Sequence, residues 1–307
     1  WFNREKRFKL ISGNRVASST TSVATKIAYP FQVLLKGNGL ILGHILGQVI
    51  ALLQFIFKIT KEILRVDITQ LKLLARKYVS FPKYSMPAAL LNILATSMPV
   101  FLIAAFDGEA ATGHFGNAYK LTYLPLSMLG LALGQVFFER IARLKGDKAE
   151  ASSMAHQLIT IMFFIALAPV LVMLVWGDVI TPLLLGPKWQ EAGVYIQITV
   201  LFYFSMFLTS TFSVAFEAYN KLRIQLVYNL SFLIASALGL YLTYYLGGGT
   251  RQALLVFAII GIVFRLGVIN YFFVLFGKNV VLKTIFAIII VSVLSLLGFG
   301  LKSGFNF

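Results

Sequence analysis

Long apolar stretches separated by short polar gaps run through the whole chain. A helix needs roughly 20 mostly apolar residues to cross a membrane, and nine stretches reach that length. They are continuously apolar, as in LLVFAIIGIVF (254–264), whereas strands of outer-membrane barrels alternate apolar and polar residues. We therefore predict an all-α fold, a polytopic transmembrane bundle with about nine spanning helices. The predicted spans are about 10–35, 39–57, 84–106, 115–138, 155–175, 191–218, 222–246, 252–276 and 280–301.

The one long polar gap, Lys58–Lys83, has the pattern of an amphipathic helix lying in the membrane interface. At about 100° per residue, Ile59, Ile63, Val66 and Leu74 share one face, and Lys61, Arg65, Lys72 and Arg76 share the other. A solvated charged loop is the alternative. We expect residues 58–83 to be a linker between the remainder of an N-terminal lobe (1–57, two spans) and a C-terminal lobe (84–307, about seven spans).

Glycines repeat every four residues in two of the predicted spans. The second span has them at 39, 43 and 47, and the fourth span at 130 and 134. Small residues at this spacing let the backbones of neighbouring helices approach closely. We predict close helix packing at these positions.

Basic residues are concentrated in alternate gaps between the predicted spans. Five gaps hold 19 of the 27 Lys and Arg residues, the intervening gaps hold four, and the last four lie inside apolar stretches. Short loops rich in Lys and Arg stay on the cytoplasmic side. We therefore predict a multi-pass protein of the cytoplasmic (inner) membrane, with the N-terminal end cytoplasmic. The short gaps Asp107–His114 and Trp176–Gly193 are then expected to be external loops. Because the chain opens on WFNREKRFK without Met, we expect further residues to precede Trp1.

Composition excludes several classes of protein. With 59% hydrophobic and 12% charged residues, the chain is far from soluble domains, which have about 25% charged residues. The net charge of +16 would suit nucleic acid, but the basic residues flank spans, so we expect anionic membrane lipids as partners and no nucleic acid. The chain has no cysteine, its three histidines lack metal-ligand spacing, and it has no P-loop or catalytic motif. We expect no metal, no cofactor and no enzymatic activity.

The first predicted span carries a polar stripe that does not suit a lipid-facing helix. Arg15, Ser18, Ser22 and Lys26 fall near one line down the helix by its 3.6-residue period. Charged residues inside spans usually face protein or a water-filled cavity. We expect this stripe to be a cationic, hydroxyl-lined wall of a substrate-binding cavity. The alternative is that Arg15 and Lys26 snorkel to opposite interfaces while the serines bond across helices.

Polar residues inside the C-terminal lobe are further candidates. Arg265 lies near the middle of the eighth span without an acidic residue in that span, so its partner is another helix, water or an anionic ligand. Glu217 is the only carboxylate well inside a predicted span, although a surface pair with Lys221, four residues on, is its favoured role. Asn92 and Lys120 complete the predicted substrate-binding set. Their alternatives are interhelical hydrogen bonding and snorkelling.

Four stretches, taken in order, carry a family resemblance: SFPKYSMPAALLN (80–92), LPLSMLGLALGQVFFER (124–140), LLGPKWQEAGVYIQI (184–198) and FSVAFEAYNKLRIQL (212–226). Together they resemble the oligosaccharide flippases of the multidrug/oligosaccharidyl-lipid/polysaccharide exporter superfamily, the Wzx-like polysaccharide biosynthesis proteins. The likeness runs over most of residues 1–285. The family has no catalytic signature, so no residue is carried over as catalytic. Its members have more spans than this chain, which implies that the first helices of the fold are absent here.

The resemblance implies a two-lobed exporter fold that rocks around a central cavity. The ligand would be a polyprenyl-pyrophosphate-linked oligosaccharide, flipped by alternating access for O-antigen (lipopolysaccharide), capsule or exopolysaccharide synthesis. A polysaccharide polymerase and glycosyltransferases of the same pathway would be partners. A multidrug efflux transporter of the same superfamily is the first alternative, although cationic drugs would favour acidic rather than basic cavity residues. A membrane-bound glycan polymerase or glycosyltransferase is the second, although a larger external loop or an acidic motif would be expected.

Overall fold

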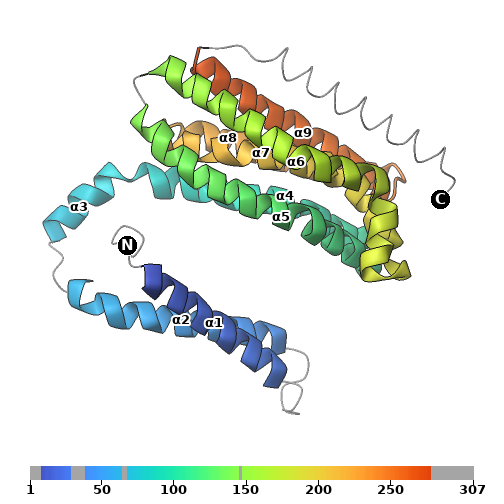
Figure 1. The fold of residues 1–307 in the computed structure, drawn as a ribbon, viewed down its shortest axis with the longest axis horizontal. Helices are drawn as coiled ribbons and strands as arrows, with labels where there is room; N and C mark the ends of the chain where they lie inside the picture. Colours follow the sequence, from blue (N-terminus) through green and yellow to red (C-terminus); the bar gives the residue numbers. More distant parts are fainter. Residues whose placement is uncertain (1–7, 29–38, 64–67, 145–146, 278–307) are drawn as a thin grey trace. The chain divides into compact units, whose positions relative to one another are not determined.

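The computed structural model describes residues 8–28, 39–63, 68–144 and 147–277. These residues form helices joined by short turns, and no strand occurs among them, which confirms the prediction of an all-α fold. The chain separates into two compact units, residues 1–78 and residues 79–307. Figure 1 labels the helices of both units.

The first unit is a pair of long helices followed by a short one. They are α1 (Phe8–Ala28), α2 (Gly39–Ile63) and α3 (Ile68–Lys77). The segment predicted as one amphipathic linker helix is therefore divided, because its first residues extend α2 and its middle forms α3. Residues 64–67 lie outside the described residues.

Close packing of α1 against α2 depends on glycine. A Cβ atom added to Gly43 would lie 2.8 Å from Cγ of Lys26, and one added to Gly47 would lie 2.8 Å from the carbonyl oxygen of Ser18. Real Cβ atoms do not come this near to other atoms. The predicted close approach is confirmed at these two glycines, and the two helices run antiparallel, since the later glycine meets the earlier residue.

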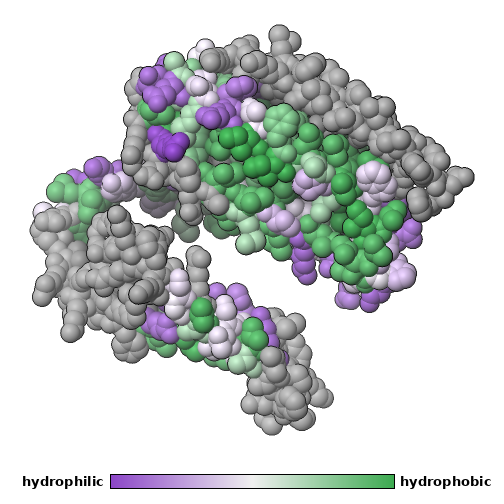
Figure 2. All heavy atoms as spheres, viewed as in Figure 1, coloured by the Kyte–Doolittle hydropathy of each residue, from purple (hydrophilic) through white to green (hydrophobic). Residues whose placement is uncertain are grey.

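The second unit holds six long helices, with short helical turns before the first of them and between α6 and α7. In order, these elements are a π-helical turn η2 (Phe81–Ser85), α4 (Met86–Phe106), α5 (Gly108–Arg143), α6 (Lys148–Leu185), a 3₁₀ turn η3 (Pro187–Trp189), α7 (Gln190–Ala218), α8 (Leu222–Tyr245) and α9 (Thr250–Leu275). Apolar side chains cover much of the visible face of this unit (Figure 2), as expected for a surface that faces lipid tails.

Five helical segments among the described residues are long and apolar enough to cross a membrane. They are Phe81–Phe106, Lys148–Leu185, Pro187–Ala218, Leu222–Tyr245 and Thr250–Leu275. The chain is therefore a multi-pass membrane protein. Five is fewer than the nine spans expected from the sequence. Within the described residues α2 contributes a shorter apolar stretch, Leu42–Gln54, and the predicted span 280–301 lies outside them.

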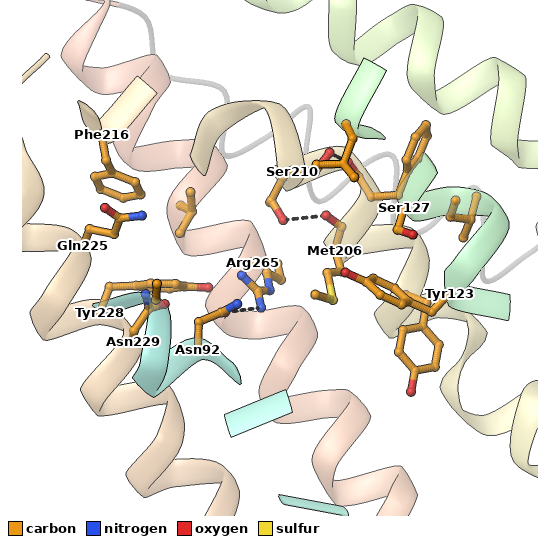
Figure 3. Close-up of a pocket in the computed structure, with 17 residues that line it drawn as sticks. Asn92, Tyr123, Ser127, Met206, Ser210, Phe216, Gln225, Tyr228, Asn229 and Arg265 are labelled. Atoms are coloured by element: carbon orange, nitrogen blue, oxygen red, sulfur yellow. Dashed lines mark hydrogen bonds between the residues drawn. The ribbon is translucent and has the colours of Figure 1, made fainter. Parts of the chain in front are cut away.

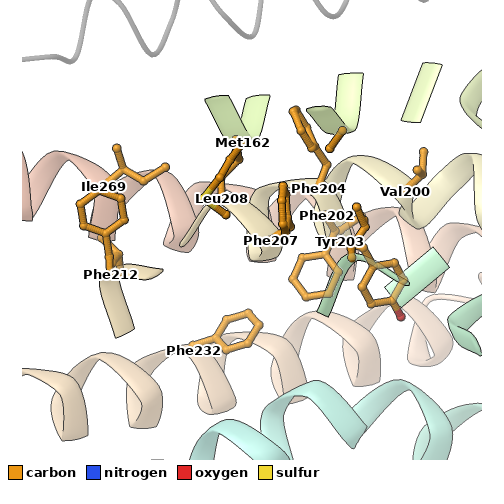
Figure 4. Packing of buried hydrophobic residues seen from close by; sticks show 14 of the residues in the cluster. Met162, Val200, Phe202, Tyr203, Phe204, Phe207, Leu208, Phe212, Phe232 and Ile269 are labelled. Atoms are coloured by element: carbon orange, nitrogen blue, oxygen red, sulfur yellow. The ribbon is translucent and has the colours of Figure 1, made fainter. Parts of the chain in front are cut away.

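Helix α7 forms the centre of the second unit and packs against α5, α6 and α9. Its phenylalanines fill the core between these helices (Figure 4). The ring of Phe202 lies 4.9 Å from that of Phe257 on α9, centroid to centroid. Gly261 makes this contact possible, because a Cβ atom at that position would overlap the Phe202 ring. One ring against one glycine thus sets how closely α7 and α9 approach at this point.

The predicted external gap Asp107–His114 is almost entirely helical. Helix α4 ends at Phe106 and α5 begins at Gly108, so that Asp107 alone separates them. Gly108 takes a φ of +80°, which favours glycine. The sharp turn lets two long helices follow each other with one intervening residue, and this is why a polar stretch expected to be a loop continues as helix.

The predicted gap Trp176–Gly193 is likewise mostly helical, because α6 continues to Leu185. The backbone of α6 breaks only at Trp176, with φ −115° and ψ 15°. A side chain of α7 bonds at this break: Nε2 of Gln197 donates to the carbonyl oxygen of Val175 and to Oδ1 of Asp178, both at 3.0 Å. Inserted side chains of this kind are a usual cause of helix kinks.

One end of the second unit is fastened by two polar contacts, which we call the Asp107 clasp and the Arg251 pair. In the clasp, Oδ2 of Asp107 accepts hydrogen bonds from Tyr244 (2.8 Å) and from Thr250. In the pair, the Arg251 guanidinium donates to both carboxylate oxygens of Glu191, at 2.8 and 2.6 Å. The two contacts hold the α4–α5 turn and the start of α7 against the start of α9.

Candidate functional site

A cavity of about 410 Å³ lies inside the second unit, between α4, α5, α7, α8 and α9. This volume is within the roughly 300–1,000 Å³ range of small-molecule sites. The polar side chains around it include Asn92, Ser127, Ser210, Gln225 and Tyr228 (Figure 3). One further lining residue, Arg265, is charged, and the other residues that line this cavity are uncharged. We call it the Arg265 cavity.

Arg265 is buried near the middle of α9, with 6% of its surface exposed. Its Nη2 donates to Oδ1 of Asn92 on α4 at 3.3 Å. Its guanidinium carbon lies 5.2 Å from the ring centroid of Phe232 and 5.9 Å from that of Tyr228, both on α8. Cation–π contacts at these distances favour the charged guanidinium. The structure thus brings together two predicted site residues, Asn92 and Arg265.

The charge of Arg265 is not balanced by an acidic residue of the described chain. No Asp or Glu oxygen among the residues that the structure describes lies within 4.0 Å of its nitrogens, and its Nε has no hydrogen-bond partner. A cation at a helix centre in a membrane costs roughly 2.5–3.5 kcal/mol. A neutral amide and two rings offset part of this cost, so that an anion entering the cavity would gain a strong electrostatic contact.

Two polar atoms of α8 beside Arg265 also lack partners. They are the hydroxyl oxygen of Tyr228 and Oε1 of Gln225, both buried. The next residue on this helix, Asn229, is already used, since its Nδ2 donates to the carbonyl oxygen of Ala88 at 2.8 Å and holds α8 on α4. Buried polar groups are rarely left unpaired. The cavity therefore offers donors (Arg265 and Tyr228) and an acceptor (Gln225) to a polar ligand.

Two serine hydroxyls add acceptors to the cavity wall. Ser127 and Ser210 donate to carbonyl oxygens of their own helices, those of Leu124 (2.8 Å) and Phe207 (2.7 Å). Because each hydroxyl hydrogen is used, the oxygen lone pairs remain available to accept a hydrogen bond from a ligand. A Cβ atom on Gly130 would lie 2.6 Å from Oγ of Ser210, which confirms the predicted close approach at this glycine.

Glu217 is not the partner of Arg265. Its Oε1 instead accepts from Oγ of Ser85 at 3.3 Å. The expected pair with Lys221 is also wrong, because no ion pair joins the two residues within the described chain. The reason is local: α7 ends at Ala218 and Asn220 takes a φ of +53°, so residues 217 and 221 do not share a helix face.

Lys120 is exposed on α5 and is not among the residues that line the Arg265 cavity. The rings of its neighbour Tyr119 and of Tyr123 stack on each other, with centroids 4.9 Å apart. These two tyrosines point to the bundle interior, where both contact Tyr203 of α7. Lys120 therefore lies on a different face of α5 from the cavity.

The predicted polar stripe of α1 belongs to the first unit and packs along the glycines of α2. Ser18 and Ser22 lie next to Gly47, and Ser22 and Lys26 lie next to Gly43. The side chain of Arg15 lies outside the described residues. These residues and Arg265 belong to different units.

Sequence reasoning missed Gln225 and Tyr228 as site residues. The available signal was the polar pair Gln225 and Asn229, four residues apart in a mostly apolar helix, the same kind of stripe that identified α1. Tyr228 was overlooked because tyrosine is grouped with the hydrophobic residues. Which of several buried tyrosines faces a cavity depends on helix packing, and the sequence does not contain that information directly.

One comparison with known proteins gives a match. The family described as polysaccharide biosynthesis protein matches residues 1–194, which contain α1 to α6 and Asn92 and end before Arg265. No curated protein and no solved structure gives a significant match. The matched residues are more than half of the 307 in the chain, and they contain two of the five membrane-length segments, Phe81–Phe106 and Lys148–Leu185. The chain therefore belongs to the polysaccharide biosynthesis protein family.

Proposed function

We propose that this chain acts in a membrane transporter that flips a polyprenyl-pyrophosphate-linked oligosaccharide across the membrane for surface polysaccharide synthesis. The observation that carries the proposal is the buried Arg265, which lines a polar cavity and bonds a neutral amide. A ligand that combines an anionic diphosphate with hydroxyl-rich sugars matches both the charge and the polar groups of this cavity. Membership in the family supports a role in polysaccharide synthesis.

The chemistry of Arg265 suits a diphosphate. The guanidinium is a planar fork that donates two parallel hydrogen bonds to phosphate oxygens. Such charge-assisted hydrogen bonds are about twice as strong as neutral ones. Asn92 positions the fork by accepting from Nη2. Tyr228 and Gln225, with their unpaired oxygens, complete a site for the phosphate and the first sugar.

In the proposed cycle, the polar stripe of α1 also binds the ligand. Arg15 and Lys26 bring two further cations, and Ser18 and Ser22 bring hydroxyls for sugar groups. Rocking of the two lobes exposes the cavity to one side of the membrane and then to the other. Lys120, exposed on α5, contacts a lipid headgroup at the membrane surface.

The pattern of basic gaps supports a location in the cytoplasmic membrane with the N-terminal end of the chain inside. In that orientation the transporter would receive its ligand from glycosyltransferases on the cytoplasmic side. A polymerase would use the flipped product on the outer side. Both are proposed partners in the same pathway, alongside the lipid-linked oligosaccharide itself.

Export of a cationic drug is a weaker fit to the same site. A cation would need carboxylates in the cavity, whereas the one charged residue that lines it is Arg265. A membrane-bound polymerase or glycosyltransferase also fits less well. The two gaps that would hold an external catalytic loop are instead almost wholly helical around Asp107 and Trp176.

Polysaccharide export by cells tests the proposal. In a strain lacking the transporter, the full-length protein should restore surface polysaccharide. A triple variant, Arg15→Gln, Lys26→Gln, Arg265→Gln, should insert at the normal level but export little. Arg265→Lys, which keeps the charge and loses the fork, should give an intermediate level. Normal export by the triple variant would contradict the proposal.

A further inference from the structure

Three tyrosines form an aromatic cluster beside Arg265. Tyr119 and Tyr123, one helical turn apart on α5, stack with their ring planes 29° apart. Tyr203 of α7 packs against both, with centroid distances of 5.8 and 5.7 Å. Tyr123 and Tyr203 line the Arg265 cavity, and Figure 3 shows Tyr123 and Tyr228 on different sides of Arg265. The cavity therefore joins a cationic site to an aromatic wall.

The hydroxyl groups set this cluster apart from the rest of the core. Elsewhere around α7 the buried rings are mainly phenylalanine, as at Phe202, Phe207 and Phe212. None of the hydroxyls of Tyr119, Tyr123 and Tyr203 bonds to another residue of the described chain, and none is among the fully buried oxygens without a partner. Phenylalanine would pack equally well without the cost of a polar group. The hydroxyls are therefore placed for a ligand that makes hydrogen bonds.

A sugar ring satisfies both properties of this wall. One face of a hexopyranose presents C–H groups, which pack on aromatic rings, while its edge carries hydroxyls, which donate to and accept from phenolic oxygens. Tyrosine combines a flat apolar surface with one polar group in the same way. A flat apolar ligand would pack on the tyrosine rings but leave their hydroxyls without hydrogen bonds. A second phosphate group bound at the tyrosines would have no second cation beside it.

We infer that Tyr119, Tyr123 and Tyr203 form a sugar subsite, which binds the hexopyranose attached directly to the diphosphate held by Arg265. The inference rests on the proposed function. The cavity of about 410 Å³ contains both Arg265 and two of the tyrosines, so a sugar bonded to the anchored phosphate reaches the aromatic wall. Sugars farther along the chain do not fit beside it and extend beyond the cavity.

Binding of matched lipids to the purified full-length protein tests the subsite. The probes are undecaprenyl pyrophosphate alone and the same lipid carrying one glucose, one galactose or one N-acetylglucosamine, with Kd measured for each. We expect at least one sugar to tighten wild-type binding about fivefold or more, as an aromatic contact of about 1 kcal/mol would. Tyr123→Leu should abolish this gain and leave the affinity for the sugar-free lipid unchanged. Tyr123→Phe, which keeps the ring and removes the hydroxyl, should retain part of the gain.

Tyr245→Leu is the matched control, because Tyr245 is 75% exposed on α8 and does not line the cavity; it should bind every probe like the wild type. Unchanged binding of the sugar-free lipid by Tyr123→Leu also shows that this variant is folded. If no sugar tightens wild-type binding, or if Tyr123→Leu keeps the gain, the subsite is wrong while the proposed function stands. If the wild type binds none of the four lipids, the proposed function itself fails.

Discussion

At the scale of single residues, the site depends on a cation whose partner is neutral. The Arg265 guanidinium bonds the Asn92 amide oxygen at 3.3 Å and contacts two rings. A carboxylate at position 92 would give a stable ion pair and remove the attraction for an anionic ligand. An amide positions the guanidinium and leaves its charge available. Under the proposed function, Asn rather than Asp at this position therefore favours ligand binding over stability.

Asn92→Asp separates these two roles. The new carboxylate should pair with Arg265, so we expect the melting temperature to be unchanged or higher, and the affinity for undecaprenyl pyrophosphate to fall about tenfold or more, the loss of one charge-assisted contact. Asn92→Ala is the control: it removes the hydrogen bond, leaves the cation unpaired, and should lower stability more than affinity. Thermal unfolding and lipid binding, measured on the same samples, check both. An Asn92→Asp variant that binds the lipid like the wild type would contradict this role.

Arg265 and Asn92 could be chosen from the sequence because polar residues inside apolar spans stand out. Their contact could not, since 173 residues separate them and the packing of both α4 and α9 on α8 brings them together. The error at Glu217 has a similar origin. Its spacing to Lys221 suggested a helical pair, but helix α7 ends between them, and a helix end is the least predictable feature of a helix.

At the scale of helices, glycines set how closely the elements approach. The repeats at 43 and 47 and the glycine at 130 were recognisable in the sequence, and each faces a neighbouring helix. Gly261 was not singled out, because no second glycine stands four residues from it; its role depends on Phe202 of a different helix. The spacing of glycines predicts that one face of a helix can approach a neighbour closely. Which side chain of the neighbouring helix packs there is known only from the fold.

Gly261→Ala tests this contact. A methyl group there would overlap the Phe202 ring, and overpacking of this kind costs about 1–3 kcal/mol, so we expect a clearly lower melting temperature in detergent. Gly267→Ala lies on the same helix with no atom within 4 Å of the added carbon. It should be neutral or slightly stabilising, because alanine favours helix by up to about 1 kcal/mol over glycine. Equal melting temperatures for the two variants would show that the contact of α7 with α9 is not tight.

At the scale of the whole molecule, hydropathy predicted the class of protein. It did not predict the structure of the segments between the predicted spans. Continuous apolar runs gave an all-α membrane protein, because backbone groups in lipid must be paired within a helix. The gaps around Asp107 and Trp176 were expected to be loops, yet they are mostly helix. Polar residues indicate where the chain is exposed to water. They do not indicate that a helix ends there, because a helix can continue from lipid into water.

The orientation in the membrane is a prediction that the absence of cysteine makes simple to test. Asp107 and Lys148 are exposed near opposite ends of α5, and a helix of 36 residues is about 54 Å long at 1.5 Å per residue. With Asp107→Cys and Lys148→Cys made separately, an impermeant thiol reagent should label position 107 in intact cells. Position 148 should be labelled only after the membrane is opened. The reverse pattern would overturn the predicted orientation.

Transport of the lipid by the reconstituted full-length protein tests the central claim most directly. In proteoliposomes, the wild type should move a fluorescent undecaprenyl-pyrophosphate oligosaccharide between leaflets, and Arg265→Gln should move it at about one tenth of that rate or less, because a charge-assisted bond to phosphate is lost. Arg265→Lys should fall between them. Movement by Arg265→Gln at the wild-type rate, or no movement by the wild type, would contradict the account.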